Sequence, residues 1–305
     1  MKEETQHGSQ KPARGTLGTL LGFVPAKVQG IAYKSARKIP GVGAAIDALL
    51  RSQIPETIPV GPYRLSLDQS DAVVSGSLAL GVYEPGTVRV WRDLVRDATG
   101  LTVLDIGANV GYFTMLAVAE NPAVRVIAFE PEPNAHAHFE RSVLANALAD
   151  RVTLLSSAAG VEPGQAELHL HPSNKGRHSL VAGSDYTSAI TVRIERVDDA
   201  LKPLGSPKVH AIKIDVEGFE PEAIAGASEL IARDHPAILF EMVPERLRAR
   251  GSDPEALLAR LWKESYTLAL IDEDTGALTE LPEESPADAI RTIEHAGVYA
   301  NVLAR

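Results

Sequence analysis

The chain has no cysteine among its 305 residues. This absence excludes disulfide bonds, thiolate metal sites and a cysteine nucleophile. Aromatic residues make up only 5% of the chain, and 30 lysines and arginines stand against 40 acids, for a formal net charge of -10. A nucleic-acid site needs cations along the phosphates and aromatic rings for the bases. We therefore expect no nucleic-acid partner.

Long hydrophobic runs are missing as well. The apolar stretch 17–24 is far shorter than the roughly 20 residues that cross a bilayer. No small-residue cleavage site follows an unbroken apolar run. The sequence therefore predicts neither a transmembrane span nor a secretory signal. We expect a cytoplasmic protein, with a peripheral contact to the membrane left open.

The charge is distributed unevenly along the chain. Residues 1–51 contain eight lysines and arginines against three acids and so carry +5, which leaves -15 for the remainder. We interpret residues 1–60 as a basic tail with short amphipathic helices. Residues 16–50 could pack on the parent domain, form a homodimer with a second copy, or lie on an anionic membrane surface. Packing against the parent domain or a second copy is favoured over the membrane surface.

From residue 101 onward, short β-branched runs alternate with helical patterns. This rhythm is typical of a parallel sheet with helices on both faces. It predicts central strands at 102–106, 124–130, 152–156, 211–215 and 237–242, and helices at 112–120, 134–148, 221–232 and 254–265.

Two further parts of the chain depart from this rhythm. The segment 161–200 reads as a hairpin-like excursion, with strands at 166–171 and 190–197 around a polar loop, and we place it near the acceptor site. The runs 267–271 and 297–303 would add a final antiparallel pair to the sheet.

A ligand of an open parallel sheet binds outside the carboxyl ends of the strands, where the strand order reverses. The turn after the first central strand is Asp105-Ile106-Gly107-Ala108-Asn109-Val110-Gly111. Its two glycines allow a sharp bend and a close approach of the backbone to a ligand. The third close glycine of the G-x-G-x-x-G pattern is missing. A pyrophosphate is therefore disfavoured, and with it a nicotinamide oxidoreductase.

Glu130 closes the second central strand, on the strand tip that neighbours the glycine turn. A carboxylate at this place can accept hydrogen bonds from both hydroxyls of a ribose. The two turns together indicate a site for an adenosine without phosphates.

Several segments together resemble the FkbM family of S-adenosylmethionine-dependent methyltransferases. The resemblance covers roughly residues 70–245 and is carried by residues 103–114, 129–131 and 212–220, with Tyr83-Glu84-Pro85 and residues 236–241 beside them. It implies a class I methyltransferase domain over residues 61–305, a Rossmann-like α/β fold with a seven-stranded, mostly parallel sheet. It also implies S-adenosylmethionine as the donor and O-methylation of a sugar, glycolipid or secondary metabolite.

The resemblance further implies which residues hold the donor. Glu130 would bind the ribose, and Ser157 and Ala158 would flank the adenine. Glu84 would lie near the donor. The methionine end would be lined by the glycine turn and the start of the following helix: Asp105, Gly107, Asn109, Gly111, Tyr112 and Phe113.

Methyl transfer to a hydroxyl depends first on the alignment of acceptor oxygen, methyl carbon and sulfur. A base that removes the hydroxyl proton adds to the rate. The catalytic candidates are Asp215 and Glu217 after the fourth central strand, Glu241 at the end of the fifth, and His178 in the polar loop. Nitrogen methyltransferases usually carry an Asn/Asp-Pro-Pro-aromatic turn where Asp215-Val216-Glu217-Gly218 stands, so we favour oxygen as the acceptor atom.

Two alternatives stay open. A divalent cation held by Asp215, Glu217 and Glu241 could bridge the protein to a vicinal diol, although we favour a reaction without metal. A membrane-associated protein with this fold could also have lost catalysis. The acceptor, a small molecule or a glycan, has no motif of its own in the sequence.

Overall fold

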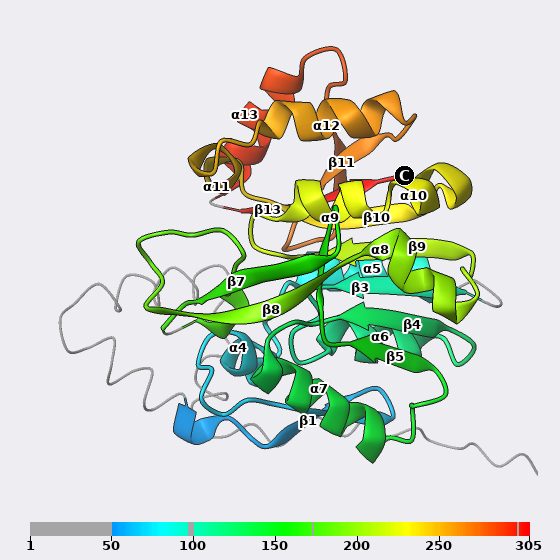
Figure 1. Ribbon diagram of the computed structural model, residues 1–305, viewed down its shortest axis with the longest axis vertical. Helices are drawn as coiled ribbons and strands as arrows, with labels where there is room; N and C mark the ends of the chain where they lie inside the picture. The colour runs from blue at the N-terminus through cyan, green and yellow to red at the C-terminus, as the bar shows by residue number, and fades with distance from the viewer. Residues whose placement is uncertain (1–50, 97–100, 173, 298) are drawn as a thin grey trace, which may run out of the picture. The chain divides into compact units, whose positions relative to one another are not determined.

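An eight-stranded sheet lies at the centre of the part of the chain that the computed structural model describes (Figure 1). The structure describes residues 51–96, 101–172, 174–297 and 299–305. Residues 1–50, to which the expected basic helices and their membrane or homodimer contacts belong, lie outside these ranges. Of the helices that are described, none is long and apolar enough to span a membrane.

The strand order of the sheet is β12-β11-β13-β10-β9-β3-β4-β5. Its five neighbouring parallel strands confirm the predicted central strands within two residues at each end. These strands are β3 (Thr102–Ile106), β4 (Arg125–Phe129), β5 (Val152–Leu155), β9 (Val209–Ile214) and β10 (Ala237–Met242).

The other edge of the sheet is antiparallel. Strand β13 (Ala300–Ala304) runs antiparallel to both β10 and β11 (Leu268–Ile271), which confirms the predicted final pair. Strand β12 (Leu278–Glu280) pairs with β11 and is an addition to the seven strands expected. It has only three residues, too few to show a strand pattern in the sequence.

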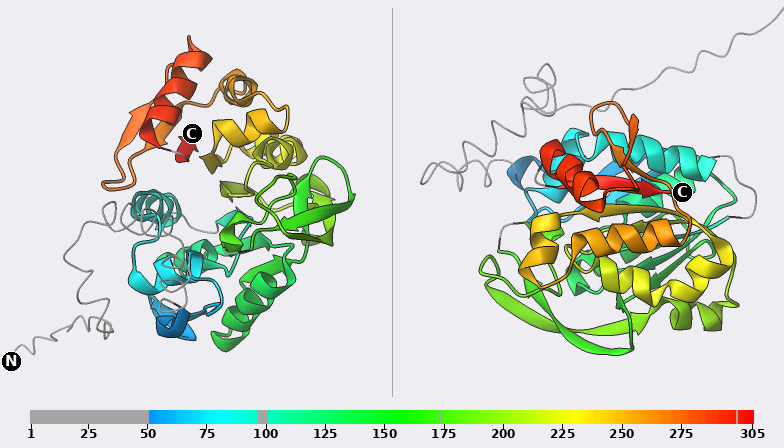
Figure 2. Two further views of the ribbon diagram at one scale, coloured as in Figure 1. Left: turned by 90° about the vertical axis from the view of Figure 1, so that its left-hand side faces the viewer. Right: turned by 90° about the horizontal axis from the view of Figure 1, so that it is seen from above.

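Helices cover both faces of the sheet, as the alternating pattern predicted (Figure 2). One core joins the sheet to α4 (Val74–Leu80), α5 (Pro85–Arg96), α6 (Tyr112–Glu120) and α7 (Pro133–Ala145). The other core joins it to α8 (Val197–Leu201), α9 (Glu220–Gly226), α10 (Ser228–Asp234), α11 (Pro244–Ala249), α12 (Pro254–Lys263) and α13 (Pro286–Ala296). The single helix expected at 221–232 is two helices, because Ala227 leaves the helical conformation between α9 and α10.

The folded unit begins before residue 61, where the sequence placed the domain boundary. It spans Ile54–Arg305. Strand β1 (Thr57–Val60) pairs with β2 (Tyr63–Ser66), and both Ile54 and Val60 are buried in a core. Residues 54–60 are therefore part of the domain and not of the tail.

A separate three-stranded sheet contains the excursion over 161–200. Strand β7 (Gly164–Leu170) pairs antiparallel with β8 (Ser188–Arg196), as predicted, and β8 also pairs with β6 (Ala158–Gly160), which follows β5 directly. The connection between β7 and β8 contains the short 3-10 helix η1 (Lys175–Arg177).

The order of the parallel strands reverses at β3. The chain proceeds from β3 to β4 and β5 on one side and later returns to β9 and β10 on the other. A ligand is therefore expected outside the carboxyl ends of the strands, next to this reversal.

Candidate active site

A cavity lies at the carboxyl ends of β3, β4 and β9, at this point of reversal. It encloses about 590 Å³, part of it open to solvent. Several residues singled out in the sequence line it: Gly107, Asn109, Glu130, Ala158, His178, Asp215 and Glu217. A second cavity of about 380 Å³ shares Gly107, Asn109 and Asp215 with the first and adds Tyr112 and Phe113.

The two glycines of the turn after β3 serve the packing of the protein itself. Gly107 has φ +80°, and a Cβ there would lie 1.9 Å from the carbonyl oxygen of Asp215. Gly111 has φ +87°, and a Cβ there would lie 2.4 Å from the ring of Phe139 on α7. The sequence predicts a sharp bend and a close approach to a ligand at these glycines. The structure adds that Gly107, which also lines both cavities, lets the loops after β3 and β9 touch.

The backbone N–H groups of this turn are all used inside the protein. The N–H groups of Gly107 and Ala108 donate to Phe129 O at 3.0 Å, and Gly111 N donates to Ala108 O at 2.8 Å. Asn109 N donates to Glu130 Oε2, and Val110 N donates to the side-chain oxygen of Asn109, each at 2.7 Å. A phosphate at a glycine turn depends on such N–H groups, so the turn is not built for a pyrophosphate.

Glu130 is the buried carboxylate of the cavity, with 6% of its surface exposed. Oε2 accepts from Asn109 N at 2.7 Å and Oε1 accepts from Glu132 N at 2.8 Å. Burial raises the pKa of Glu130 to about 8, although these two backbone hydrogen bonds act to lower it. Because a carboxylate offers about four acceptor positions, each oxygen keeps one for a ligand hydroxyl.

The wall beyond Glu130 is apolar. Ala158 and Ala159 at the start of β6 line it together with Phe129. Ser157, expected to flank an adenine, is not in the cavity wall, and its hydroxyl donates to Glu195 Oε2 at 2.6 Å. An aromatic base would therefore lie against Ala158 and Ala159 rather than against Ser157.

A strap formed by residues 174–180 passes over the cavity. Lys175, Gly176, His178 and Leu180 line the cavity from the strap. Lys175 Nζ pairs with Asp68 Oδ2 at 2.6 Å, and Ser179 Oγ donates to Glu217 O at 2.7 Å. The excursion, placed near the acceptor in the sequence, thus covers the cavity that Glu130 lines.

We expect the Asp68–Lys175 pair to give a pH-dependent contribution to stability. Burial alone would raise the pKa of Asp68, but hydrogen bonds from Lys175 and Ser70 lower it from 3.8 to about 2. A lowered carboxyl pKa stabilises the folded state above 3.8, and this contribution is lost as the pH falls through about 2. D68N should therefore cost about 1–2 kcal/mol at pH 7 and little at pH 2.

Urea unfolding of wild type and D68N between pH 2 and 7 measures this difference. D199N is the matched control, since Asp199 also pairs with a lysine, Lys202, at 2.6 Å, but is 44% exposed. Its effect should be small at every pH, because solvent screens an exposed ion pair. A D68N difference that stays constant from pH 7 to pH 2 would contradict the role of the ion pair.

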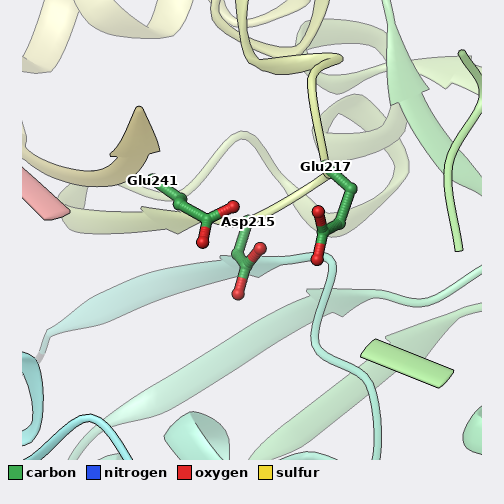
Figure 3. Close-up of side chains that lie close together, drawn as sticks. All are labelled: Asp215, Glu217 and Glu241. Atoms are coloured by element: carbon green, nitrogen blue, oxygen red, sulfur yellow. The ribbon is translucent and has the colours of Figure 1, made fainter. Parts of the chain in front are cut away.

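Three catalytic candidates lie together at the edge of the cavity. One oxygen each from Asp215, Glu217 and Glu241 lies within 4.8 Å of the others. Figure 3 shows the three carboxylates gathered from the ends of β9 and β10. Asp215 and Glu217 line the first cavity, whereas Glu241 does not. Asp215 lies between the other two carboxylates in Figure 3. Burial, followed by the charge of Asp215, raises the pKa of Glu241.

Two neighbouring residues hold this acidic loop in place. Arg246 on α11 forms an ion pair with Glu217, and its guanidinium is 3.9 Å from Glu241 Oε2. Glu220 is the first residue of α9, and its Oε1 accepts from Gly218 N at 3.1 Å and Val216 N at 3.3 Å. Glu217 itself has φ 57°, a conformation that is uncommon for a residue other than glycine and that often occurs at functional sites.

His178 lines the cavity, but its bonding does not suit a base. Its Nδ1 accepts from His171 N at 3.0 Å, so a neutral ring carries its proton on Nε2. Burial lowers the pKa of His178 and favours this neutral form. His178 can then donate a hydrogen bond into the cavity, whereas Asp215 and Glu217 can accept a proton.

Some residues expected at the donor lie behind the cavity wall. Asp105 is fully buried, and its Oδ2 accepts from Thr114 Oγ1 at 2.7 Å. Glu84 precedes α5 with φ 39°, and burial raises its pKa to about 8. Neither Asp105, Glu84 nor Gly111 is part of either cavity wall.

Sequence reasoning missed several residues of the site. Lys213 lines the second cavity from within β9. A lone lysine within an apolar run is the sequence signal that could have identified it. The cationic side chains of Arg246 and Lys175 reach the site from segments that contain no recognisable motif. Further residues of the first cavity wall were also missed, among them Glu132, Ala135, Leu168, Val216 and Phe219.

The similarity to known proteins covers the part of the chain that contains this site. A family model described as the methyltransferase FkbM domain matches residues 105–268, more than half of the chain. The methyltransferase sdnD of Sordaria araneosa is 27% identical over 187 residues, which cover 51% of this chain and 71% of sdnD. The 31-O-demethyl-FK506 methyltransferase FkbM of Streptomyces tacrolimicus is 29% identical over 157 residues, which cover 43% of this chain and 60% of that protein.

One more relative and one solved structure are also similar to the chain. The 2-O-methyltransferase NoeI of Sinorhizobium fredii is 26% identical over 175 residues, which cover 51% of this chain and 70% of NoeI. The solved structure of a methyltransferase FkbM from Methylobacillus flagellatus aligns with a TM-score of 0.44 and 15% identity, over 86% of this chain and 58% of that one.

Proposed function

The chain belongs to the FkbM family of methyltransferases, and from this premise we propose that it is an O-methyltransferase that uses S-adenosylmethionine. The acceptor would be a hydroxyl of a sugar, a glycolipid or another secondary metabolite. The observation that carries the proposal is the position of Glu130 and Asp215, which line one cavity at the switch point of the sheet.

The residues of the cavity fit a nucleoside with a sulfonium side chain. Glu130 keeps acceptor positions for two ribose hydroxyls, and Ala158 and Ala159 offer an apolar surface for the base. The second cavity, which adjoins the first at Asp215, would receive the methionine end beside Tyr112 and Phe113. The N–H groups of the glycine turn already have partners within the protein, which disfavours the pyrophosphate of a nicotinamide dinucleotide.

The chain contributes alignment and a base. S-adenosylmethionine would supply an electrophilic methyl carbon and leave as the thioether with the electron pair of the carbon–sulfur bond. The acceptor oxygen would bond to that carbon, and Asp215 would take up its proton. Asp215 lines both cavities and so lies between the two halves of the site. Glu217 is held by Arg246, so it is less free to take a proton.

Two experiments test this proposal. Isothermal titration of the purified chain with S-adenosylhomocysteine should show binding, whereas NADH should show none. Transfer of label from S-[methyl-³H]adenosylmethionine should then be measured on a panel of hydroxylated acceptors. The panel includes 31-O-demethyl-FK506, the compound named for one similar methyltransferase, together with glycosides and glycolipids. Binding of NADH instead of S-adenosylhomocysteine would overturn the proposal.

We expect the reaction to need no divalent cation, although three carboxylates gather at the site. Arg246 already pairs with Glu217 and approaches Glu241, so a metal ion would have to displace its guanidinium. Treatment with EDTA and removal of the chelator should therefore leave label transfer unchanged. A loss that magnesium or manganese ions restore would instead favour the metal-assisted alternative.

A further inference from the structure

Lys213 is a buried cation in the middle of the central sheet. Only 3% of its surface is exposed, and it lies on β9 between apolar neighbours. An ammonium group in this environment is costly unless opposite charges surround it. Its place at the wall of the second cavity therefore needs a reason beyond packing.

Carboxylates from several elements surround this lysine. Lys213 Nζ donates to Asp215 Oδ2 at 3.0 Å, and Asp105 is its register partner on β3. One oxygen of Asp105 has no hydrogen-bond partner among the described residues, so Lys213 is the cation that offsets its charge. Glu84 before α5 and Glu241 on β10 also feel the charge of Lys213.

The hydrogen bond from Lys213 also fixes the orientation of Asp215. Strand alternation puts residues 213 and 215 on the same side of β9, so the ammonium reaches the carboxylate directly. The other side of the ammonium faces the ring of Phe113, 4.5 Å from its centroid. Because the bond uses Oδ2, Oδ1 is the oxygen left to receive a proton from an acceptor hydroxyl.

Other acidic side chains also lie near Asp215. Glu84, Asp105 and Glu241 interact electrostatically with it. Tyr83 is a further titratable group near Asp215. Lys213 is the cation that contacts Asp215 directly, since Arg246 is engaged with Glu217.

We propose that Lys213 is a positioning residue for methyl transfer, which holds the Asp215 carboxylate through its hydrogen bond and keeps it turned toward the acceptor. It acts through Asp215. This inference rests on the proposed function, in which Asp215 accepts the hydroxyl proton.

Carbon-13 NMR of protein labelled at aspartate Cγ tests the inference without any acceptor. The Asp215 signal is assigned by its loss in D215N and is then compared between variants at one fixed pH. In K213M the Asp215 signal should shift, because the carboxylate loses the ammonium that donates to it at 3.0 Å. K213R should restore most of the wild-type position of the signal. An unchanged signal in K213M would overturn the inference.

A kinetic cycle tests whether Lys213 acts through Asp215. With the acceptor found by label transfer, K213M should lower kcat by about 10- to 100-fold and change the dissociation constant of S-adenosylhomocysteine by less than about threefold. In a D215N background, K213M should cause no further loss of kcat. Losses that multiply would show that Lys213 acts independently, and would overturn the inference. If D215N alone keeps full kcat, the base assignment fails while the NMR result still decides the charge coupling.

Two further variants serve as a control and as a substitute for K213M. K175M removes another cation from the cavity wall, but one that pairs with Asp68, so it should leave the Asp215 signal unchanged. Should K213M fail to fold, K213Q takes its place in both measurements. Its amide is neutral, so a shifted Asp215 signal in K213Q would support the role of the ammonium and an unchanged signal would contradict it.

Discussion

Replacing Asp215 with asparagine should lower kcat for methyl transfer by about 10² to 10⁴, the usual contribution of a positioned base. Asparagine has nearly the same size and keeps an oxygen that can accept from Lys213 Nζ, which is 3.0 Å from Asp215 Oδ2. Its amide cannot take up the proton of a hydroxyl. The loss should therefore appear in kcat, while the affinity for S-adenosylhomocysteine changes by less than about threefold.

Single-turnover transfer of labelled methyl groups measures the rate in D215N, and isothermal titration measures the donor affinity. E217Q is the matched control, since Glu217 lines the same cavity but is paired with Arg246. Its kcat should fall much less than that of D215N. An equal loss of kcat and donor affinity in D215N would make Asp215 a binding or structural residue.

The sequence predicted the centre of the fold because burial leaves a simple pattern there. Strands buried on both faces appear as short apolar runs, and the polar residue that ends each run marks the edge where a ligand binds. Glu130 and Asp215 were found in this way, and both line the cavity. Residues such as Ser157 follow a strand in the same manner but turn toward a neighbouring strand instead. Position at a strand end therefore predicts proximity to the site but not the direction of the side chain.

The cations of the site could not be predicted in the same way. Lys213 lies inside an apolar run, and only strand alternation hints that it shares a side with Asp215. Arg246 reaches Glu217 from α11, which depends on how the chain returns after β10. Lys175 reaches Asp68 across more than a hundred residues of sequence. Such pairs depend on tertiary contacts, which leave no local periodicity.

The small elements at the margins were missed for a related reason. Strands β1 and β2 have four residues each and are defined by their pairing with one another. Strand β12 is a three-residue edge of the sheet. A pattern of alternation needs about four to eight residues to be recognised, so the domain boundary at residue 61 fell inside a structure that begins at Ile54.

Replacing Glu130 with alanine should weaken the binding of S-adenosylhomocysteine by about 1–3 kcal/mol, or roughly 5- to 150-fold. The loss arises because two ribose hydroxyls would be left without an acceptor in a site where Glu130 is only 6% exposed. The alanine also leaves the N–H groups of Asn109 and Glu132 without their partner. E130Q keeps one acceptor oxygen at the same place, so its loss of affinity should be smaller.

The pH dependence of binding separates the ribose role of Glu130 from a general loss of packing. Burial raises the pKa of Glu130 to about 8, and the hydroxyls of a ribose bind best to the carboxylate form. Since the ligand favours the deprotonated group, affinity in the wild type should rise as the pH increases from 6.5 toward 9. The glutamine of E130Q does not titrate. Any rise of affinity with pH that remains in E130Q therefore comes from other groups or from the ligand, and it is subtracted from the rise in the wild type. Parallel pH curves for wild type and E130Q, or an unchanged dissociation constant in E130A, would show that the ribose lies elsewhere.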